Sequence, residues 1–261
     1  MKAPVIIIIV VVILLGIVLA CLFSCSAKKT KGINVTQKAL TLDDSKWITT
    51  EDDRRIYDDD KYTTYCGIDV SEWTGEIDWE RAKNDGIQFA IMRVGYRGYE
   101  TGKFVYDTNL RHYLKGAVEA GVDCGVYFVS QAINEMEARE EADMILEQVY
   151  GIPLTMPIYI DLEAAGGPAR TDTLTSEDYT KIVNAFCERV EENGFRGGIY
   201  SNETWITRHL DWNNLSQWDL WFAKYTPIPA TDFLFNVWQY SESALIDGIE
   251  NQCDINIRIC K

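Results

Sequence analysis

Two carboxylic acids spaced two residues apart, Asp161 and Glu163, are the residues of this sequence best suited to chemistry. They follow the apolar run 157–160, which is typical of a buried strand. Side chains two apart on a strand share a face, with Cα atoms roughly 6–7 Å apart, so both carboxyls cannot ionise freely and their pKa values split. The longer Glu163 is the better candidate for a general acid. Asp161 could act as nucleophile, as base, or as the group that orients a neighbouring acetamido group.

Two further acids, Asp69 and Asp254, occupy matching positions on other strand-like segments. Aromatic and amide side chains accompany them: Tyr127, Tyr200, Trp221, Tyr225, Trp238 and Gln239. Carboxylates for acid–base work, together with aromatic faces, are typical of a carbohydrate site. Structural roles are also open, because Asp69 could cap a turn, Asp254 could pair with an arginine or a backbone amide, and the aromatic rings could pack in the core. We predict that the four acids are catalytic and that the other six residues bind substrate.

The segments that carry these residues alternate between strand-like and helix-like patterns. Strands are predicted at 66–70, 89–94, 122–129, 157–162, 198–201, 220–225, 235–240 and 252–256, and helices at 79–84, 108–120, 134–150, 175–193 and 204–209. Repeated strand–helix units predict a parallel sheet covered by helices, and eight strands suggest closure into a barrel. An open doubly wound sheet would need a glycine-rich nucleotide loop, which the sequence lacks. We therefore predict an α/β fold, a TIM-like barrel with five β/α units followed by three β-strands, (β/α)5(β)3.

Composition and missing motifs narrow the chemistry. A formal net charge of −15 excludes the basic stripe that nucleic acid requires. Neither H-E-x-x-H nor G-x-S-x-G occurs, and the two histidines, His112 and His209, fall in helical stretches. The cysteines form no C-x-x-C pair, so neither a metal site nor a cofactor is predicted. Cys66 and Cys253 would open neighbouring strands; a disulfide is conceivable, but two buried thiols are the simpler expectation.

The amino-terminal quarter does not resemble part of a barrel. Residues 3–25 carry no charge and are numerous enough to cross a bilayer core of roughly 30 Å. We predict a transmembrane anchor or signal segment at 1–25, with lipidation of Cys21 as an alternative. Residues 26–64 are polar and acidic and are predicted to form a solvated stalk or linker, which leaves 65–261 as the catalytic barrel. Three lysines shortly after the apolar run conflict with an outward orientation under the positive-inside rule.

These segments resemble glycoside hydrolase family 25, the N-acetylmuramidases (lysozymes) that cut the β-1,4 bond between N-acetylmuramic acid and N-acetylglucosamine in bacterial peptidoglycan. The matching stretches are GIDVSEWTGEIDW (67–79), FAIMRVGY (89–96), GVYFVS (125–130), PIYIDLE (157–163), GGIYSN (197–202), LWFAKY (220–225) and WQYSESALIDGIENQCDIN (238–256). The resemblance implies the same barrel, with Glu163 as general acid assisted by Asp161. Asp69 and Asp254 would complete the acidic cluster, with Tyr127 nearby.

The sequence departs from the family pattern at Thr74, where Gln is common, and at Phe128, where His is common. The resemblance implies action on peptidoglycan glycan strands outside a bacterial cell by a membrane-anchored, secreted or lipoprotein enzyme, with no obligate protein partner. Two other functions stay open. A cell-wall-binding module on the same barrel would bind without cleaving. A chitinase-like hydrolase would carry further acids before D-x-E, where this chain has Ile158 and Tyr159.

Overall fold

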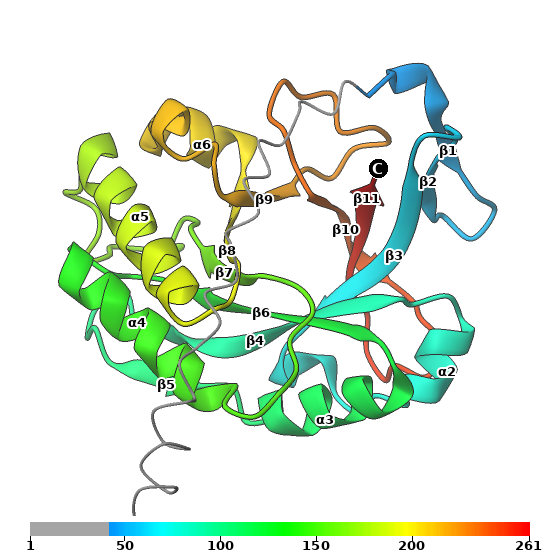
Figure 1. The fold of residues 1–261 in the computed structure, drawn as a ribbon, viewed down its shortest axis with the longest axis horizontal. Helices are drawn as coiled ribbons and strands as arrows, with labels where there is room; N and C mark the ends of the chain where they lie inside the picture. The colour runs from blue at the N-terminus through cyan, green and yellow to red at the C-terminus, as the bar shows by residue number, and fades with distance from the viewer. Residues whose placement is uncertain (1–41) are drawn as a thin grey trace, which may run out of the picture. The chain divides into compact units, whose positions relative to one another are not determined.

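A closed barrel of eight strands organises the part of the chain that the structure, a computed structural model, describes: residues 42–261 (Figure 1). Around the barrel the strands are β3 (Thr63–Val70), β4 (Phe89–Arg97), β6 (Asp123–Val129), β7 (Ile158–Asp161), β8 (Gly197–Asn202), β9 (Asp219–Ala223), β10 (Val237–Ala244) and β11 (Cys253–Cys260). Because β11 pairs with β3 and β3 pairs with β4, the sheet closes on itself. The predicted α/β barrel is confirmed.

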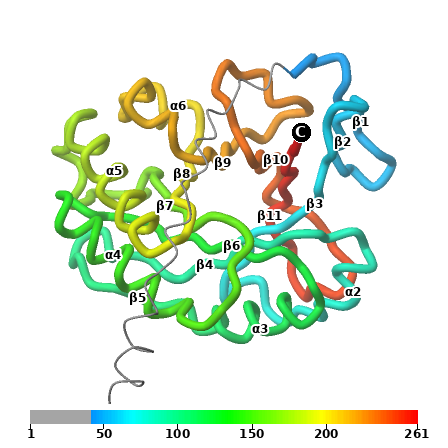
Figure 2. Tube along the Cα trace, in the orientation of Figure 1, coloured from blue at the N-terminus to red at the C-terminus, as the bar shows by residue number. Residues whose placement is uncertain are grey.

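Five α-helices follow the first five barrel strands and lie around the outside of the sheet (Figures 1 and 2). They are α2 (Trp79–Asn84), α3 (Leu110–Ala120), α4 (Glu135–Gln148), α5 (Ser176–Glu192) and α6 (Glu203–His209). Local sequence sets their ends. The Thr175 side chain accepts a hydrogen bond from the Asp178 backbone N–H at the start of α5, and Gly121, with φ of 72°, ends α3 in the left-handed conformation.

The last strand runs against its neighbours. Each neighbouring pair from β3 around to β10 is parallel, whereas β11 is antiparallel to both β10 and β3. The short connection from β10 to β11 explains the reversal, because a parallel pair needs a long crossover and an antiparallel pair does not. The reversal places the start of β11 at the same end of the barrel as the end of β3. We call this end the mouth of the barrel.

Strand alternation divides the apolar residues between two cores. One cluster lies inside the barrel and includes Phe89, Tyr159, Trp221 and Val237. The larger cluster lies between the sheet and the outer elements and contains the alternate strand residues, among them Trp238 on β10. Successive side chains on a strand point to opposite faces, so most barrel strands supply both cores, while β11 supplies apolar residues to the outer core only. The same alternation decides which side chains reach the mouth.

A short strand that was not predicted, β5 (Phe104–Tyr106), folds back on the end of β4. Gly95 lies where the two strands meet, with φ of 153°, and a Cβ added there would clash with the Val105 carbonyl oxygen. Only glycine allows the two backbones to approach so closely.

Residues 42–64 form a folded hairpin rather than a stalk. It comprises η1 (Asp44–Lys46), β1 (Trp47–Thr49) and β2 (Arg55–Tyr57), and Trp47 packs edge-on against Trp238 with ring centroids 5.0 Å apart. The prediction of a solvated stalk over 26–64 is therefore wrong for 42–64, because apolar rings spaced among the acids bury themselves against the barrel. The rest of that range, 26–41, lies outside the described residues.

The five cysteines beyond residue 42 are free. Cys66 pairs across the β3–β11 ladder with Ile257, four residues along β11 from Cys253. That offset is about 13 Å at ~3.3 Å per residue, too far for a disulfide. Burial raises the pKa of the Cys66 thiol and raises that of Cys253 to about 12. The conceivable disulfide between Cys66 and Cys253 is therefore absent from the structure.

Within residues 42–261, no helix has the length and apolar character needed to span a membrane. The transmembrane prediction is corrected accordingly. The anchor or signal segment predicted at 1–25, including Cys21, lies outside the residues that the structure describes.

Candidate active site

Asp69 and Asp254 face each other at the mouth of the barrel. They are partners in the antiparallel register of β3 and β11, and Asp69 is almost completely buried. Burial raises the pKa of both carboxyls, and the neighbouring Asp69 charge helps to raise the pKa of Asp254 to about 9. Two adjacent carboxylates cannot both ionise, so the pair shares one proton at neutral pH. Asp254 holds that proton and donates it to Asp69 in a hydrogen bond.

Side-chain amides hold Asp69 in its ionised form. Gln239 Nε2 and Asn256 Nδ2 donate to Asp69 Oδ1 over 2.9 and 2.7 Å. Trp221 Nε1 in turn donates to Asn256 Oδ1 over 2.8 Å, which fixes the orientation of that amide. Hydrogen bonds to a carboxylate favour its charged state. The network explains why Asp69 is the acceptor of the acid pair.

Gln239 also accepts hydrogen bonds from the hydroxyl groups of two tyrosines. Tyr200 and Tyr225 donate to Gln239 Oε1 over 2.8 and 3.0 Å. Gln239 and Trp221 were predicted to contact substrate, but they are only 2% and 1% exposed and offer no surface to a sugar ring. That prediction is wrong. Gln239 donates a hydrogen bond to Asp69, and Trp221 orients Asn256, which donates a second one. Tyr225, at 51% exposed, remains available to a ligand.

Asp161 ends β7 and is buried without a full set of hydrogen-bond partners. The side chain lies next to Tyr200 in the β7–β8 register. Its Oδ1 atom has no partner among the residues that the structure describes. Burial raises the pKa of Asp161 well above its usual range, and the charges of Glu163 and Asp69 raise it further. A buried carboxyl oxygen without a partner is costly and is therefore a candidate for a ligand contact.

Glu163 lies two residues beyond the last residue of β7 and is exposed to solvent. Nearby protein still removes part of its hydration, and this desolvation, followed by the charge of Asp254, raises the pKa of Glu163. A glutamate with a raised pKa holds its proton closer to neutral pH, as a general acid must. The structure thus places the four predicted acids together, with Glu163 as the accessible one.

Arg93 on β4 supplies a positive charge that the sequence analysis overlooked. Its Nε donates to Asp107 Oδ2 over 3.0 Å, and its guanidinium pairs with Glu72 at 3.1 Å. The Arg93 charge lowers the otherwise raised pKa of Asp161. A charged residue inside the apolar run 89–94 was the signal that could have identified it, because such a residue is almost never buried without a partner.

The remaining predicted aromatic residues divide between the barrel interior and its outside. Tyr127 on β6 is half-buried and packs edge-on against Trp221, 5.5 Å between centroids, so it lies inside the barrel; its contact with substrate stays a prediction. Trp238 is fully buried on the outer face of β10, where its Nε1 donates to the Lys224 carbonyl over 2.8 Å. The prediction that Trp238 binds substrate is therefore wrong. Strand alternation forces it outward because Gln239 points inward.

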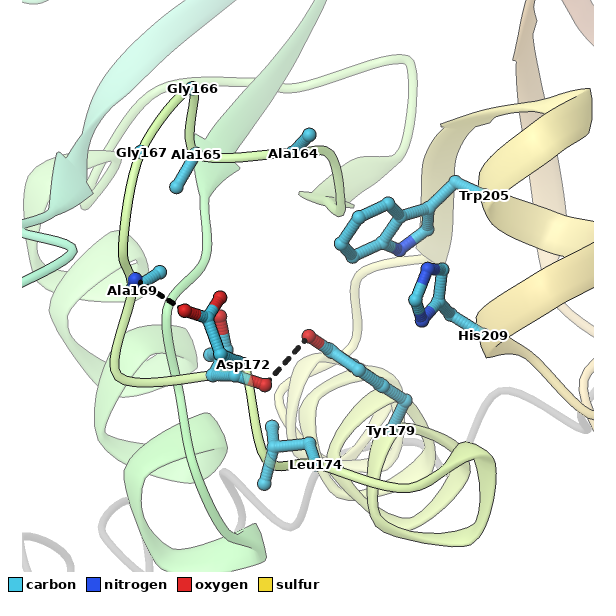
Figure 3. A pocket seen from close by; sticks show the side chains of 11 residues that line it. Ala164, Ala165, Gly166, Gly167, Ala169, Asp172, Leu174, Tyr179, Trp205 and His209 are labelled. Atoms are coloured by element: carbon cyan, nitrogen blue, oxygen red, sulfur yellow. Dashed lines mark hydrogen bonds between the residues drawn. The ribbon is translucent and has the colours of Figure 1, made fainter.

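A pocket of about 380 Å³ lies next to Glu163, because residues 164–167 directly after it form one wall (Figure 3). The opposite wall carries Trp205 and His209 from α6 and Tyr179 from α5. The Trp205 and His209 ring centroids are 4.2 Å apart, so the two rings pack against each other. Small residues facing aromatic rings suit the faces and acetamido groups of sugars. No cluster of three or more His, Cys, Asp or Glu within residues 42–261 could hold a metal ion.

Comparisons with known proteins agree with this geometry. The sequence model of glycosyl hydrolases family 25 matches residues 68–249. Lysozyme M1 of Streptomyces globisporus is 25% identical over 200 residues, which cover 73% of this chain and 66% of the relative. The modular autolysin LytC from Streptococcus pneumoniae shares the fold with a TM-score of 0.68 at 23% identity, over 81% of this chain and 51% of LytC.

The bacterial lysozyme from Streptomyces coelicolor shares the fold with a TM-score of 0.62 at 23% identity, over 74% of this chain and 91% of that protein. This chain thus spans less than two thirds of Lysozyme M1 and about half of LytC. The family match contains Asp69, Asp161 and Glu163, and it covers well over half of the sequence. The chain belongs to glycosyl hydrolases family 25.

Proposed function

We propose that this chain is a peptidoglycan hydrolase, an N-acetylmuramidase that cleaves the β-1,4 bond between N-acetylmuramic acid and N-acetylglucosamine. The observation that carries the proposal is the pair of acids at the end of β7, where Asp161 is buried, Glu163 is exposed and both have a raised pKa. Family membership supports hydrolysis of a glycosidic bond. The similar proteins named lysozyme and autolysin support a cell-wall glycan as its substrate.

Glu163 is the general acid in this proposal. Its exposure lets the glycosidic oxygen of a bound strand approach, and its raised pKa keeps a proton available for transfer. Proton transfer to the leaving oxygen lets the glycosidic bond break with oxocarbenium-like charge on the remaining sugar. Deprotonated Glu163 can then take a proton from the incoming water, since the same group serves as acid and base in successive steps.

Asp161 assists at the adjacent carbon. An acetamido N–H of the bound sugar would satisfy its buried Oδ1, which lacks a protein partner. An acetamido group oriented in this way can attack the anomeric carbon in place of an enzyme nucleophile. Direct attack by the Asp161 carboxylate is the alternative route and would leave a covalent glycosyl–enzyme intermediate.

Asp69 and Asp254 tune the charge at the mouth. Asp69 stays ionised on its amide partners, which gives a fixed negative charge close to where positive charge develops. The Asp69 charge raises the pKa of Asp161. Asp254 is neutral below its pKa of about 9, so desolvation is the main reason for the raised pKa of Glu163. In this proposal the two β7 acids share one proton, which Glu163 delivers while Asp161 acts as the carboxylate.

The test is digestion of purified peptidoglycan by the full-length protein, followed by borohydride reduction and mass spectrometry. Fragments that end in reduced muramic acid, absent when Glu163→Gln is used, would support the proposal. Fragments that end in reduced glucosamine would contradict the bond assignment. Binding of the wall without any cleavage would favour a binding module. Because peptidoglycan lies outside the cytoplasmic membrane, the proposal places the domain on that side.

A further inference from the structure

The amino-terminal hairpin lies before the stretch that matches the family, 68–249, yet it is firmly attached to the barrel. Trp47 contacts Trp238 on the outer face of β10. Tyr57 is buried next to Trp47, and the centroids of these two rings are 5.2 Å apart. Arg54 pairs with Asp85 at 2.7 Å, just beyond α2. Figure 1 shows β1 and β2 alongside β3. These contacts fix the position of the hairpin turn.

The hairpin closes one side of a second pocket, of about 350 Å³, against the end of β10 and the loop after β9. Its lining includes Asp53, Arg55, Tyr225, Ser241, Glu242 and Ser243. Arg55 is held in place from two sides, because its NH1 pairs with Asp53 at 2.8 Å and its guanidinium lies 5.2 Å from the Tyr240 ring centroid. The pocket is therefore walled by ordered, mainly polar side chains.

This pocket adjoins the acidic cluster. Tyr225 lines it with an exposed ring and donates its hydroxyl to Gln239, which binds Asp69. Glu242, which also lines the pocket, acts electrostatically on Asp254 and contributes to its raised pKa. A glycan that reaches Glu163 across the mouth can therefore extend over Tyr225 toward the hairpin.

The chemistry of the lining selects the ligand. Arg55 lines the pocket, and its guanidinium can donate to an acceptor oxygen of a ligand. Two acids, Asp53 and Glu242, outnumber that single cation and disfavour a carboxylate. The Tyr225 ring offers a flat face, and the serine hydroxyls offer both donors and acceptors. An uncharged sugar with hydroxyl and acetamido groups fits this set, whereas an acidic peptide does not.

We propose that the hairpin adds a sugar-binding subsite to the barrel, which takes an uncharged N-acetylhexosamine of the glycan strand beyond the two sugars at the scissile bond. The inference rests on the proposed function and specifies which part of the strand this chain binds outside its catalytic centre. A subsite of this kind makes affinity depend on glycan length.

The test compares binding of peptidoglycan-derived glycans of four and eight sugars by isothermal titration calorimetry. The full-length chain carries Glu163→Gln in every case, so that the ligand is not cleaved. Arg55→Ala removes the guanidinium, and Ser243→Trp fills the pocket from β10 without altering the hairpin. Glu51→Gln is the matched control, because Glu51 is an exposed residue of the same turn that does not line the pocket.

We expect the longer glycan to bind about tenfold more tightly, equivalent to about 1.4 kcal/mol, and Glu51→Gln to keep that gain. Arg55→Ala and Ser243→Trp should bind both lengths with equal affinity. The subsite is refuted if both variants keep the tenfold gain, or if the parent shows none. Absence of binding at either length would overturn the proposed function together with the subsite, an outcome distinct from loss of the length dependence alone.

Discussion

Glu141 and Asp161 are both buried acids, but their surroundings differ. Glu141 on α4 is fully buried. Its carboxylate accepts hydrogen bonds from Arg97 Nε over 2.7 Å and from the Ser130 hydroxyl over 2.6 Å. Burial raises the pKa of Glu141 to about 7, while Ser130 and Arg97 lower it. Asp161 has an oxygen without a partner in the described chain, and two neighbouring acids raise its pKa beyond the effect of burial.

The contrast distinguishes a buried acid that stabilises the fold from a buried acid that serves the proposed function. Removing a carboxylate from water costs several kcal/mol unless a cation and hydrogen bonds replace the water. Glu141 has those replacements and joins α4 to β4, so its role is to hold the barrel wall. Asp161 lacks them and lies at the mouth beside Glu163, which is where the proposed function requires a carboxyl that contacts the substrate. The predictions below test this distinction.

The largest effect is expected for Glu163→Gln. Loss of the general acid should lower kcat on peptidoglycan by about 10²–10⁴-fold. Because Glu163 is exposed, the free energy of unfolding should change by less than about 0.5 kcal/mol. Initial rates of muropeptide release and urea unfolding measure the two quantities. A variant with more than a tenth of the parent kcat would show that another residue supplies the proton.

Glu141→Ala should have the opposite pattern. It leaves Arg97 buried without its closest carboxylate, so unfolding should become easier by about 3 kcal/mol while kcat of the folded enzyme changes less than twofold. Glu140→Ala is the control, because Glu140 is half-exposed and 3.4 Å from Arg97. The control should cost less than about 1 kcal/mol. A large loss of kcat in Glu141→Ala would erase the distinction between the two buried acids.

Asp161→Asn should lower kcat by about 10²-fold and leave stability within about 1 kcal/mol of the parent. The side chains are nearly the same shape, and burial raises the pKa of Asp161, so loss of the carboxylate charge costs the fold little. Steady-state kinetics and thermal unfolding provide the comparison. If stability falls by several kcal/mol with kcat unchanged, Asp161 is structural like Glu141.

Asp254→Asn should change how stability depends on pH. Its pKa is about 9 in the folded state and near 3.8 when unfolded, so the folded state binds the extra proton between these values. Stability from this group is therefore greatest at acid pH and falls as pH rises toward 9. The variant should show a shallower fall in the free energy of urea unfolding between pH 7 and 9. The same slope as the parent would show that the acid pair does not share a proton.

Hydrophobic patterning predicted the barrel well. The alternating strand-like and helix-like runs predicted α2 at its observed bounds, 79–84, and predicted all eight strands within a few residues of their observed positions. The hairpin was missed because eight acids between 41 and 60 masked the apolar rings of Trp47 and Tyr57. The reversal of β11 was also missed, since strand patterns carry no information about direction.

The acids at the mouth were predictable, but most of their supporting residues were not. Asp69, Asp161 and Asp254 end or begin strands, where sequence position alone places them at one end of a barrel. Trp238 was wrongly predicted to bind substrate. Because side chains alternate between the two faces of a strand, Trp238 must point outward when Gln239 points inward. The role of Asn256 depends on a pairing between strands far apart in the sequence, which no local pattern reveals.

The most direct test of the account is a carbon-detected NMR titration of the side-chain carboxyls, assigned by conservative variants of Asp69, Asp161, Glu163 and Asp254. We predict that the Asp69–Asp254 pair loses its second proton near pH 9, and that Glu163 titrates above its ordinary value of 4.5. Ionisation of all four groups below pH 5 would contradict the central claim that uncompensated acids at the mouth retain protons for catalysis.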